Sequence, residues 1–347
     1  MEKARKDIKL LKPYFAEQFK GLRMDTNANI LGINPAITRA LSTAKFAINQ
    51  YPAPNSDFLR KALAKKLKLS PDNIIAGNGS DEILDFIMRA YLEPNDALAI
   101  PTPTFVMYKI YGILNFAKVI EIPLTRTKKV WDLDVSAFLK AKPKITIIAN
   151  PNNPTGNCFP ENDILKIIEN SKGIIVIDEA YAEYSGKSLL PYINKYSNLI
   201  ITRTFSKAYA LAGLRIGYGV AQQSIIEELL KVKPPYNLNA VSESLAIEAL
   251  KSNAWLKKIV KITIEEREKL SKELEKLGFE VYPSVTNFVL AKAPINSEKL
   301  CAALRKKAIL IKDFGMQKEL ENCVRITIGK REDNSRLIKS INVILRS

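Results

Sequence analysis

A lysine at a strand-to-turn junction is the first candidate for chemistry in this sequence. Lys207 lies in TFSKAYALAGLRIGY, residues 204–218, directly after an apolar run. Its amine could form a Schiff base with an aldehyde. The hydroxyls of Thr204 and Ser206 and the guanidinium of Arg215 could hold a phosphate dianion beside it. A single Ser-Lys pair is uninformative, but the full spacing SKxxxLxGxRxGY is specific.

Two further segments could supply more of a site for a phosphate and a ring. In GNGSDEIL, residues 77–84, a turn opens a helix, and its backbone N–H groups around Ser80 and Asp81 could bind phosphate. The turn NPNNPTG, residues 150–156, follows an apolar run, and Asn153 could donate to an oxygen on a ring. Taken alone, the first segment is equally explained as a helix cap and the second as a tight loop.

An acidic side chain at the end of an apolar run adds a partner for a ring nitrogen. Asp178 opens DEAYAEY, residues 178–184, and Tyr181 follows shortly after it. A carboxylate in that place can pair with a ring nitrogen and keep it protonated, and a protonated pyridine stabilises a carbanion. The alternative role of Asp178 is to cap a helix.

The chain contains no histidine among its 347 residues. This excludes Ser-His-Asp and Cys-His nucleophile systems as well as the HExxH zinc motif. Three scattered cysteines, Cys158, Cys301 and Cys323, form no CxxC pair, so no metal site is expected. The proton carrier of any reaction must therefore be Lys, Tyr, Cys or a carboxylate, unless a cofactor does the work.

Charge and composition bear on partners and location. The net charge is +17, from 53 Lys and Arg against 36 Asp and Glu, so a basic nucleic-acid-binding protein without enzymatic activity is one alternative. The basic residues are spread along the chain among acids, which favours a solvated surface and no nucleic-acid partner. No stretch approaches the ~20 apolar residues of a membrane helix. The charged N-terminus is unlike a signal peptide, and with the scattered cysteines it predicts a cytoplasmic protein.

Strands and helices alternate through the middle of the chain. The runs predicted as strands are residues 144–150, 173–178 and 198–205. Residues 161–173 predict a helix ended by Gly173. This alternation favours a mainly parallel sheet with helices on its faces, and ligands of such sheets bind beyond the carboxyl ends of the strands. Asn150, Asp178 and Thr204 fall at those ends.

The last third of the chain predicts a smaller α+β domain. Its expected elements are a helix over about 253–277, two short strands within 279–293, a helix at 296–308, strands at 309–315 and 324–330, and a closing helix. We expect an α/β fold with a three-layer α/β/α large domain over residues 36–245. Residues 1–35 and 246–347 are expected to form the small domain.

The order GNGSDE, NPNNPTG, DEAY, SKAYALAGLRIGY and VRITIG resembles that of the fold-type I pyridoxal-phosphate (PLP) aminotransferases. Within them, LKPY, KPPYNLN and SVTNFVL are most similar to the histidinol-phosphate aminotransferases, over nearly the whole chain. The resemblance implies PLP as cofactor and transamination from histidinol phosphate to 2-oxoglutarate in histidine biosynthesis. It also implies a ping-pong Schiff-base mechanism and a homodimer whose active site is shared between subunits.

The resemblance further implies a role for each site residue. Lys207 would carry the Schiff base and move the proton from the substrate Cα to C4′ of the cofactor. Asp178 would pair with the ring nitrogen, and Tyr181 and Asn153 would hydrogen-bond the phenolic oxygen. The other cofactor-binding residues would be Ser80, Asp81, Phe105 on the ring face, Thr204, Ser206, Arg215 and, from a second subunit, Tyr51. The substrate pocket would contain Arg325, Tyr14, Asn27, Asn153 and Lys312.

Three positions differ from the family pattern. Phe105 stands where Tyr or Trp is more usual, so the ring is kept but its polar group is lost. Ala28 stands where NENP would supply a carboxylate, and Lys312 stands where Arg is frequent, which loses bidentate geometry. An aromatic or broad-specificity aminotransferase is therefore an alternative, and a threonine-phosphate decarboxylase is a further one.

Overall fold

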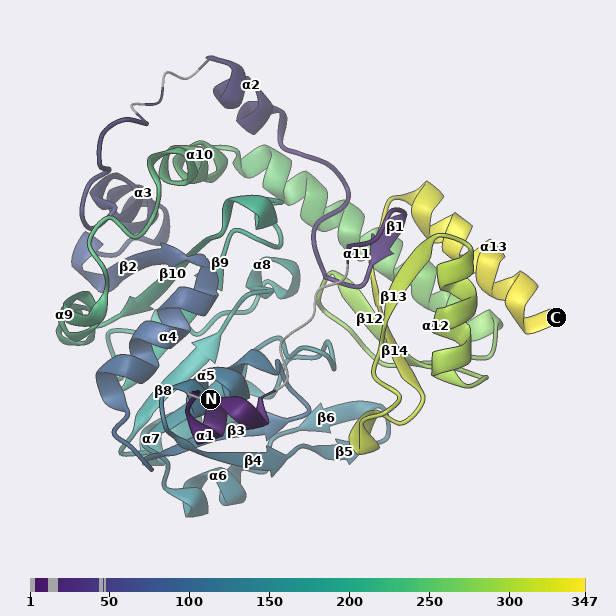
Figure 1. Cartoon of the computed structure of the whole chain (residues 1–347), viewed down its shortest axis with the longest axis horizontal. Coiled ribbons are helices and arrows are strands. Elements are labelled where there is room, and N and C mark those ends of the chain that lie inside the picture. Colours follow the sequence, from purple (N-terminus) through teal and green to yellow (C-terminus); the bar gives the residue numbers. More distant parts are fainter. Residues whose placement is uncertain (1–3, 12–17, 44–45, 47, 347) are drawn as a thin grey trace.

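The computed structural model describes residues 4–11, 18–43, 46 and 48–346, and it contains a large and a small sheet (Figure 1). The large sheet has seven strands in the order β2 (Ile74–Asn78), β10 (Ile216–Ala221), β9 (Leu199–Thr204), β8 (Ile174–Asp178), β7 (Ile145–Ala149), β3 (Ala97–Thr102) and β4 (Lys118–Pro123). All are parallel except β10, which is antiparallel to both neighbours. The predicted mainly parallel sheet is confirmed.

Helices cover both faces of this sheet. Buried side chains of one face pack with α3 (Asp57–Leu67), α6 (Val135–Ala141), α7 (Glu161–Asn170) and α10 (Ala240–Lys251). Those of the other face pack with α4 (Gly79–Tyr91), α5 (Met107–Leu114) and α9 (Gln223–Val232). This is the predicted three-layer α/β/α arrangement. Continuous apolar strands such as ITIIA of β7 follow from it, because both of their faces are covered.

Strand alternation decides which layer each functional side chain meets. On β8, Ile175 and Ile177 pack with the α7 layer, whereas Val176 packs with the α4 and α5 layer. Side chains two residues apart share a face, so Asp178 at the end of β8 points to the same layer as Val176. On β9, Ile200 packs with that layer too, which directs Thr204 to the same side.

One helix ends earlier than the sequence suggested. The helix predicted to run to Gly173 ends at Asn170. A Cβ on Gly173 would lie 2.4 Å from the carbonyl oxygen of Pro143, so glycine is needed there for a close backbone approach rather than to stop the helix.

The small sheet has the order β1 (Leu22–Met24), β13 (Ile309–Asp313), β14 (Cys323–Thr327), β12 (Phe288–Lys292) and β11 (Glu280–Val281). Its core packs against α11 (Asn253–Lys276), α12 (Ser297–Lys306) and α13 (Arg331–Arg346). The 24 residues of α11 span roughly 36 Å and lead from α10 to this sheet (Figure 1). The α+β character predicted for the last third is confirmed.

The remaining α-helices and strands are α1 (Lys6–Leu10), α2 (Pro35–Thr43), the hairpin of β5 (Thr125–Thr127) and β6 (Val130–Asp132), and α8 (Ala182–Ser185). Within the first 35 residues, β1 pairs in parallel with β13, whereas Arg5 donates to the carbonyl oxygen of Leu114, the last residue of α5. The domain boundaries at 35/36 and 245/246 stay predictions. Among the residues that the structure describes, no helix has the length and apolar character needed to cross a membrane.

Candidate active site

Lys207 lies in the turn that follows β9, where the two sheets come together. Its Nζ is 3.4 Å from the carbonyl oxygen of Thr26 and 5.6 Å from the ring centroid of Tyr181. Thr26 follows β1 of the small sheet, while Tyr181 follows β8 of the large one. The side chain is partly exposed, so a small molecule can reach its amine.

Beside Lys207 lie the residues predicted to bind phosphate, which we call the predicted phosphate cup: Ser80, Asp81, Thr204, Ser206 and Arg215. The backbone N–H of Ser206 donates to Oγ1 of Thr204 at 3.1 Å. Arg215 lies between two members, with Nη1 at 3.4 Å from Oγ of Ser206 and Nη2 at 2.8 Å from Oδ2 of Asp81. Residues from β9, the start of α4 and the loop before β10 are thus brought together.

A backbone contact holds the start of α4 against β10. A Cβ on Gly217 would lie 2.2 Å from both the carbonyl carbon of Gly79 and the backbone nitrogen of Ser80. Gly79 itself has a φ of +77°, and a Cβ there would lie 2.7 Å from Nη2 of Arg215. Glycine at both positions therefore lets the backbone of β10 pack directly against the start of α4, beside the guanidinium of Arg215.

Asp178 is a buried carboxylate at the end of β8. Its Oδ2 accepts a 2.6 Å hydrogen bond from the hydroxyl of Tyr108, and its Oδ1 accepts from the N–H of Ala180 at 3.1 Å. Burial raises the pKa of Asp178 to about 6, while the bonds from Tyr108 and Ala180 act in the opposite direction. The contacts do not favour a helix-capping role for Asp178. Tyr181 is the residue that directly precedes α8, and Asp178 bonds to Tyr108 instead.

Tyr181 is held from the small-domain side. Nδ2 of Asn27 donates to its hydroxyl at 3.0 Å, and its ring packs edge-on against Phe288 at 5.3 Å between centroids. Asn27 has a φ of +56° and is itself fixed, because its N–H donates to Thr327 and its carbonyl oxygen accepts from Asn287. The Tyr181 hydroxyl accepts from Asn27, so its own hydrogen can be donated elsewhere.

Arg325 connects the small sheet to the large domain. From β14 its Nη1 donates to Oδ1 of Asn153, and its Nη2 donates to the carbonyl oxygen of Asp25. The guanidinium carbon is 5.4 Å and 5.5 Å from the ring centroids of Phe288 and Phe314. With Oδ1 of Asn153 engaged, its Nδ2 is the group that can donate to a ligand. The guanidinium is buried yet charged, which suits an anion-binding role.

The other predicted residues occupy different surroundings. Lys312 is exposed on β13 in register with Arg325 on β14, so their side chains lie on the same face of the small sheet. Phe105 packs edge-on against Tyr108, the partner of Asp178. Tyr51 is 82% exposed, and its ring stacks on that of Tyr236. Tyr14 lies outside the described residues.

The family model for class I and II aminotransferases matches residues 20–341. The chain belongs to this aminotransferase family. A curated histidinol-phosphate aminotransferase from Caldanaerobacter subterraneus is 40% identical over 98% of this chain and 98% of its own length. The solved histidinol-phosphate aminotransferase of Clostridium acetobutylicum is 28% identical, with a TM-score of 0.86 over 94% of this chain and 99% of that one.

The fold of this aminotransferase also matches a structure at lower identity. The histidinol-phosphate aminotransferase of Sinorhizobium meliloti, solved in complex with pyridoxal-5'-phosphate, has a TM-score of 0.90 at 24% identity. It covers 100% of this chain, and this chain covers 98% of it. The predicted α/β fold with a large and a small domain is therefore confirmed for the chain as a whole.

The contact residues of this aminotransferase that were not predicted include Tyr108, Asn287 and Thr327. Phe105 precedes α5 and Tyr108 lies in its first turn, so their spacing in PTPTFVMY was a usable signal that the two rings are neighbours. Asn287 and Thr327 bind Asn27 from 260 and 300 residues away. Nothing local in the sequence indicates such contacts.

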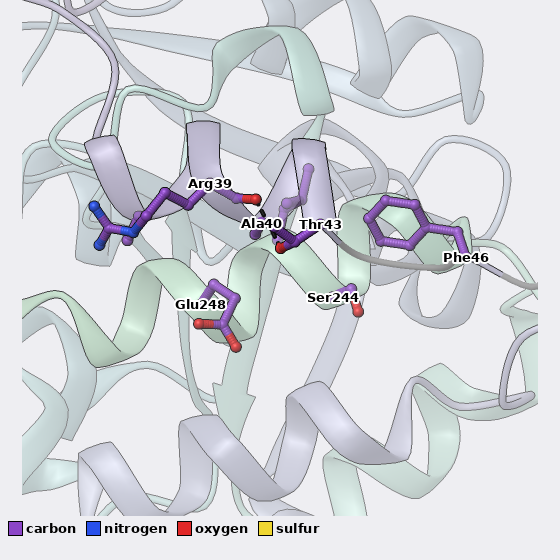
Figure 2. Close-up of a pocket in the computed structure, with 8 residues that line it drawn as sticks. Arg39, Ala40, Thr43, Phe46, Ser244 and Glu248 are labelled. Carbon is purple, nitrogen blue, oxygen red and sulfur yellow. Dashed lines mark hydrogen bonds between the residues drawn. The ribbon is translucent and has the colours of Figure 1, made fainter.

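A separate pocket of about 340 Å³ lies between α2 and α10 of the aminotransferase (Figure 2). Arg39 and Thr43 line it from α2, Ser244 and Glu248 from α10, and Phe46 from the segment after α2. Its lining includes none of the residues predicted to hold cofactor or substrate. We therefore assign it no part in the reaction.

Proposed function

We propose that this aminotransferase binds PLP at the carboxyl ends of β8 and β9 and transfers an amino group through it. The observation that carries the proposal is that three unlike groups lie at the same edge of the large sheet. They are the amine of Lys207, the buried carboxylate of Asp178 and the predicted phosphate cup, supplied by neighbouring strands of the large sheet.

The donor set fits the cofactor group by group. The start of α4 can offer backbone N–H groups to a phosphate, and Arg215 adds a positive charge beside Ser206. Asp178 can accept from a protonated ring nitrogen at a point where water is excluded. Phe105, against Tyr108, offers a ring face for stacking.

When bound, PLP would supply an aldehyde that accepts the amino group and a ring that takes up the electron pair left at the substrate Cα. Nζ of Lys207 would then take the proton from Cα and return it to C4′ of the cofactor. The Tyr181 hydroxyl and Nδ2 of Asn153 would donate to the phenolic oxygen. Asp178 would hold the proton on the ring nitrogen throughout.

For the substrates, the proposal is histidinol phosphate as amino donor and 2-oxoglutarate as acceptor. Relatives with the first of these in their names match the chain along nearly its full length. Arg325 and Lys312 lie in register on one face of the small sheet, and together they offer two positive charges to the anionic end of each substrate. This assigns the chain to histidine biosynthesis, and with the three cysteines unpaired we propose a cytoplasmic location.

The proposal includes a homodimer. Large apolar side chains are exposed along one stretch of the described chain, namely Ile33, Leu41, Ile48, Tyr51 and Phe58. Such an accumulation is typical of a surface that another protein covers. A second copy of the chain placed there would bring Tyr51 towards the cofactor phosphate of its neighbour.

An aromatic amino-acid aminotransferase is the second candidate, and the observation that favours it is Lys312. An exposed lysine at this position gives a point charge on a flexible stem rather than the bidentate fork of an arginine. Discrimination in favour of a phosphate monoester would then be weaker, and an uncharged ring could be accepted in its place.

The test is an absorbance titration of the protein reconstituted with PLP. Glutamate, histidinol phosphate, phenylalanine and threonine phosphate are added separately. Loss of the visible band with glutamate and histidinol phosphate, and formation of pyridoxamine phosphate, is the expected result. Conversion by phenylalanine but not histidinol phosphate would replace the proposed substrate with an aromatic one, and CO2 release from threonine phosphate would indicate a decarboxylase.

The control is Lys207→Ala, which keeps the predicted phosphate cup but removes the amine. We expect it to bind PLP without the visible band of the lysine adduct and to lose turnover. Substantial turnover by this variant would contradict the role of Lys207, and a wild-type protein that gains no visible band with PLP would contradict the cofactor.

A further inference from the structure

The most exposed aromatic residue of the described chain is held in a defined position. Tyr51 belongs to the arm, residues 48–54, and is 82% exposed. Its ring stacks on that of Tyr236 with centroids 4.7 Å apart and planes 25° apart. A side chain that leaves its own subunit needs such support, because otherwise its free rotation would oppose binding to a partner.

A buried lysine anchors the base of this arm. Nζ of Lys233 donates to the carbonyl oxygen of Pro54 at 2.8 Å, to that of Pro234 at 2.9 Å and to Oδ1 of Asn237 at 3.2 Å. An ammonium group has three hydrogens, so all of them are used. Lys233 is only 8% exposed, although lysine is rarely buried. The N–H of Tyr236 donates to the same carbonyl oxygen of Pro54 at 3.4 Å.

The loop of residues 233–237, which contains Lys233, is also fixed to α4, the helix that begins at the predicted phosphate cup. Nδ2 of Asn237 donates to Oε2 of Glu82 at 2.7 Å and to the carbonyl oxygen of Ala76 at 3.2 Å. Glu82 also accepts from the N–H of Asn78 at 2.7 Å, at the start of α4. The loop of residues 233–237 therefore joins the arm of a subunit to the cup of that same subunit.

We propose that Lys233 is a positioning residue that acts in trans, by fixing the arm so that Tyr51 reaches the cofactor of the partner subunit. The inference rests on the proposed PLP-dependent homodimer. A residue that acts in cis would affect the cofactor of its own subunit. Lys233 is instead proposed to affect the cofactor of the other subunit. The contacts with Pro54 favour the trans role, since they hold the arm directly and reach the cup only through Asn237.

The first test measures the rate at which homodimers release PLP. The protein is diluted into a solution that traps free PLP, and the decay of its visible absorbance is recorded. Tyr51→Phe should release PLP about 10-fold faster, as expected for loss of one hydrogen bond to a charged group. Lys233→Met should show a similar increase. The matched control is Lys231→Met, an exposed residue two positions away whose ammonium contacts only Glu228 among the described residues, and it should be unchanged.

Mixed dimers then separate trans from cis. A dimer of one Lys207→Ala chain and one Lys233→Met chain has a single lysine-bound cofactor, on the Lys233→Met chain. Its Tyr51 comes from an intact arm, so release at the wild-type rate is expected. A wild-type chain paired with a Lys207→Ala/Lys233→Met chain receives Tyr51 from the altered arm, so fast release is expected. The reverse pattern, or equal rates, would overturn the inference.

Failure of the inference and failure of the proposed function are distinguishable. Unchanged release from Tyr51→Phe contradicts the shared site itself, whereas a defect in Tyr51→Phe without one in Lys233→Met contradicts only the role of Lys233. If Lys233→Met does not fold, Tyr236→Asn serves instead. It removes the stacked ring at the surface while keeping a residue that tolerates the φ of +57° found there, and the same mixed-dimer pattern is expected.

Discussion

The hydroxyl of Tyr108 donates a 2.6 Å hydrogen bond to Oδ2 of Asp178, and both side chains are buried. Tyr108 comes from α5 and Asp178 from the end of β8, so the bond ties a covering helix to the strand end beneath it. A donor at this distance stabilises the charged form of a carboxylate. Tyr108 thereby counteracts the burial that would otherwise favour the neutral acid.

Tyr108→Phe tests this relationship. The ring and its contact with Phe105 are kept, but the pKa of Asp178 should rise above its present value of about 6 because a donor to the anion is lost. Affinity for PLP at pH 7 should fall about 10-fold, as for loss of a hydrogen bond to a charged group. Equilibrium titration of cofactor-free protein with PLP measures this. Tyr91→Phe, at the far end of α4, should leave the affinity unchanged, and an equal affinity for Tyr108→Phe would refute the role.

Stability of the cofactor-free protein should depend on pH through Asp178. Its pKa is raised from 3.8 to about 6 in the folded state, so the folded protein holds this proton more tightly than the unfolded chain does. Its contribution to stability is present below pH 3.8 and is lost as the pH rises through 6. The loss is on the order of 3 kcal/mol, from about 1.4 kcal/mol for each pKa unit.

Asp178→Asn should therefore stabilise the cofactor-free protein at pH 8 by up to about 3 kcal/mol, with the difference vanishing near pH 4. Urea unfolding at pH 4, 6 and 8 provides the measurement. Asp72→Asn, whose side chain is 60% exposed, is the control and should show no such trend. A variant that is less stable than wild type at pH 8 would contradict the argument. With PLP bound, the wild-type protein should be more stable than Asp178→Asn, because the carboxylate then has the ring nitrogen as its partner.

Much of this site could be predicted from the sequence because its residues lie in short segments at strand ends. Lys207, Thr204, Ser206 and Arg215 occupy one stretch of the chain, and the preceding apolar run indicates where the strand ends. A residue such as Asp178 at the end of β8 needs only the rule that parallel strands place their carboxyl ends at one edge. The alternation of strands and helices likewise predicted the layers.

Other contacts could not be predicted, because they join segments without any local pattern. Arg325 and Asn153 are 172 positions apart, and Lys233 and Pro54 are 179 apart. Their meeting depends on how the small sheet packs on the large domain and how a loop packs under the arm. The helix end predicted at Gly173 was wrong for a related reason. Glycine is needed there because the backbone passes close to Pro143, and the sequence does not show that contact.

Gly217→Ala should damage the predicted phosphate cup. The added Cβ would lie 2.2 Å from backbone atoms of Gly79 and Ser80, and β10 is paired on both sides, so it has no room to shift. We expect a loss of about 1–3 kcal/mol in stability and a loss of PLP affinity, as for overpacking of a fixed core. Gly213→Ala is the control, because a Cβ there has nothing within 4 Å. Urea unfolding and PLP titration report the two effects, and a Gly217→Ala protein that binds PLP normally would contradict a role of this backbone contact in shaping the cup.

Substitutions of Lys312 should change the choice between anionic and aromatic donors. Lys312 lies opposite Arg325 across β13 and β14, so both cations face the same space. Lys312→Arg adds a planar fork suited to a phosphate, and the ratio of kcat/KM for histidinol phosphate to that for phenylalanine should rise several-fold. Lys312→Met removes the charge, and the ratio should fall about 10-fold, as for loss of one charge-assisted contact. Because the carboxylate of phenylalanine carries less charge than a phosphate dianion, its own kcat/KM should change less than that of histidinol phosphate in both variants. If both substrates change in parallel, Lys312 affects the fold or the domain contact rather than recognition of the anionic end.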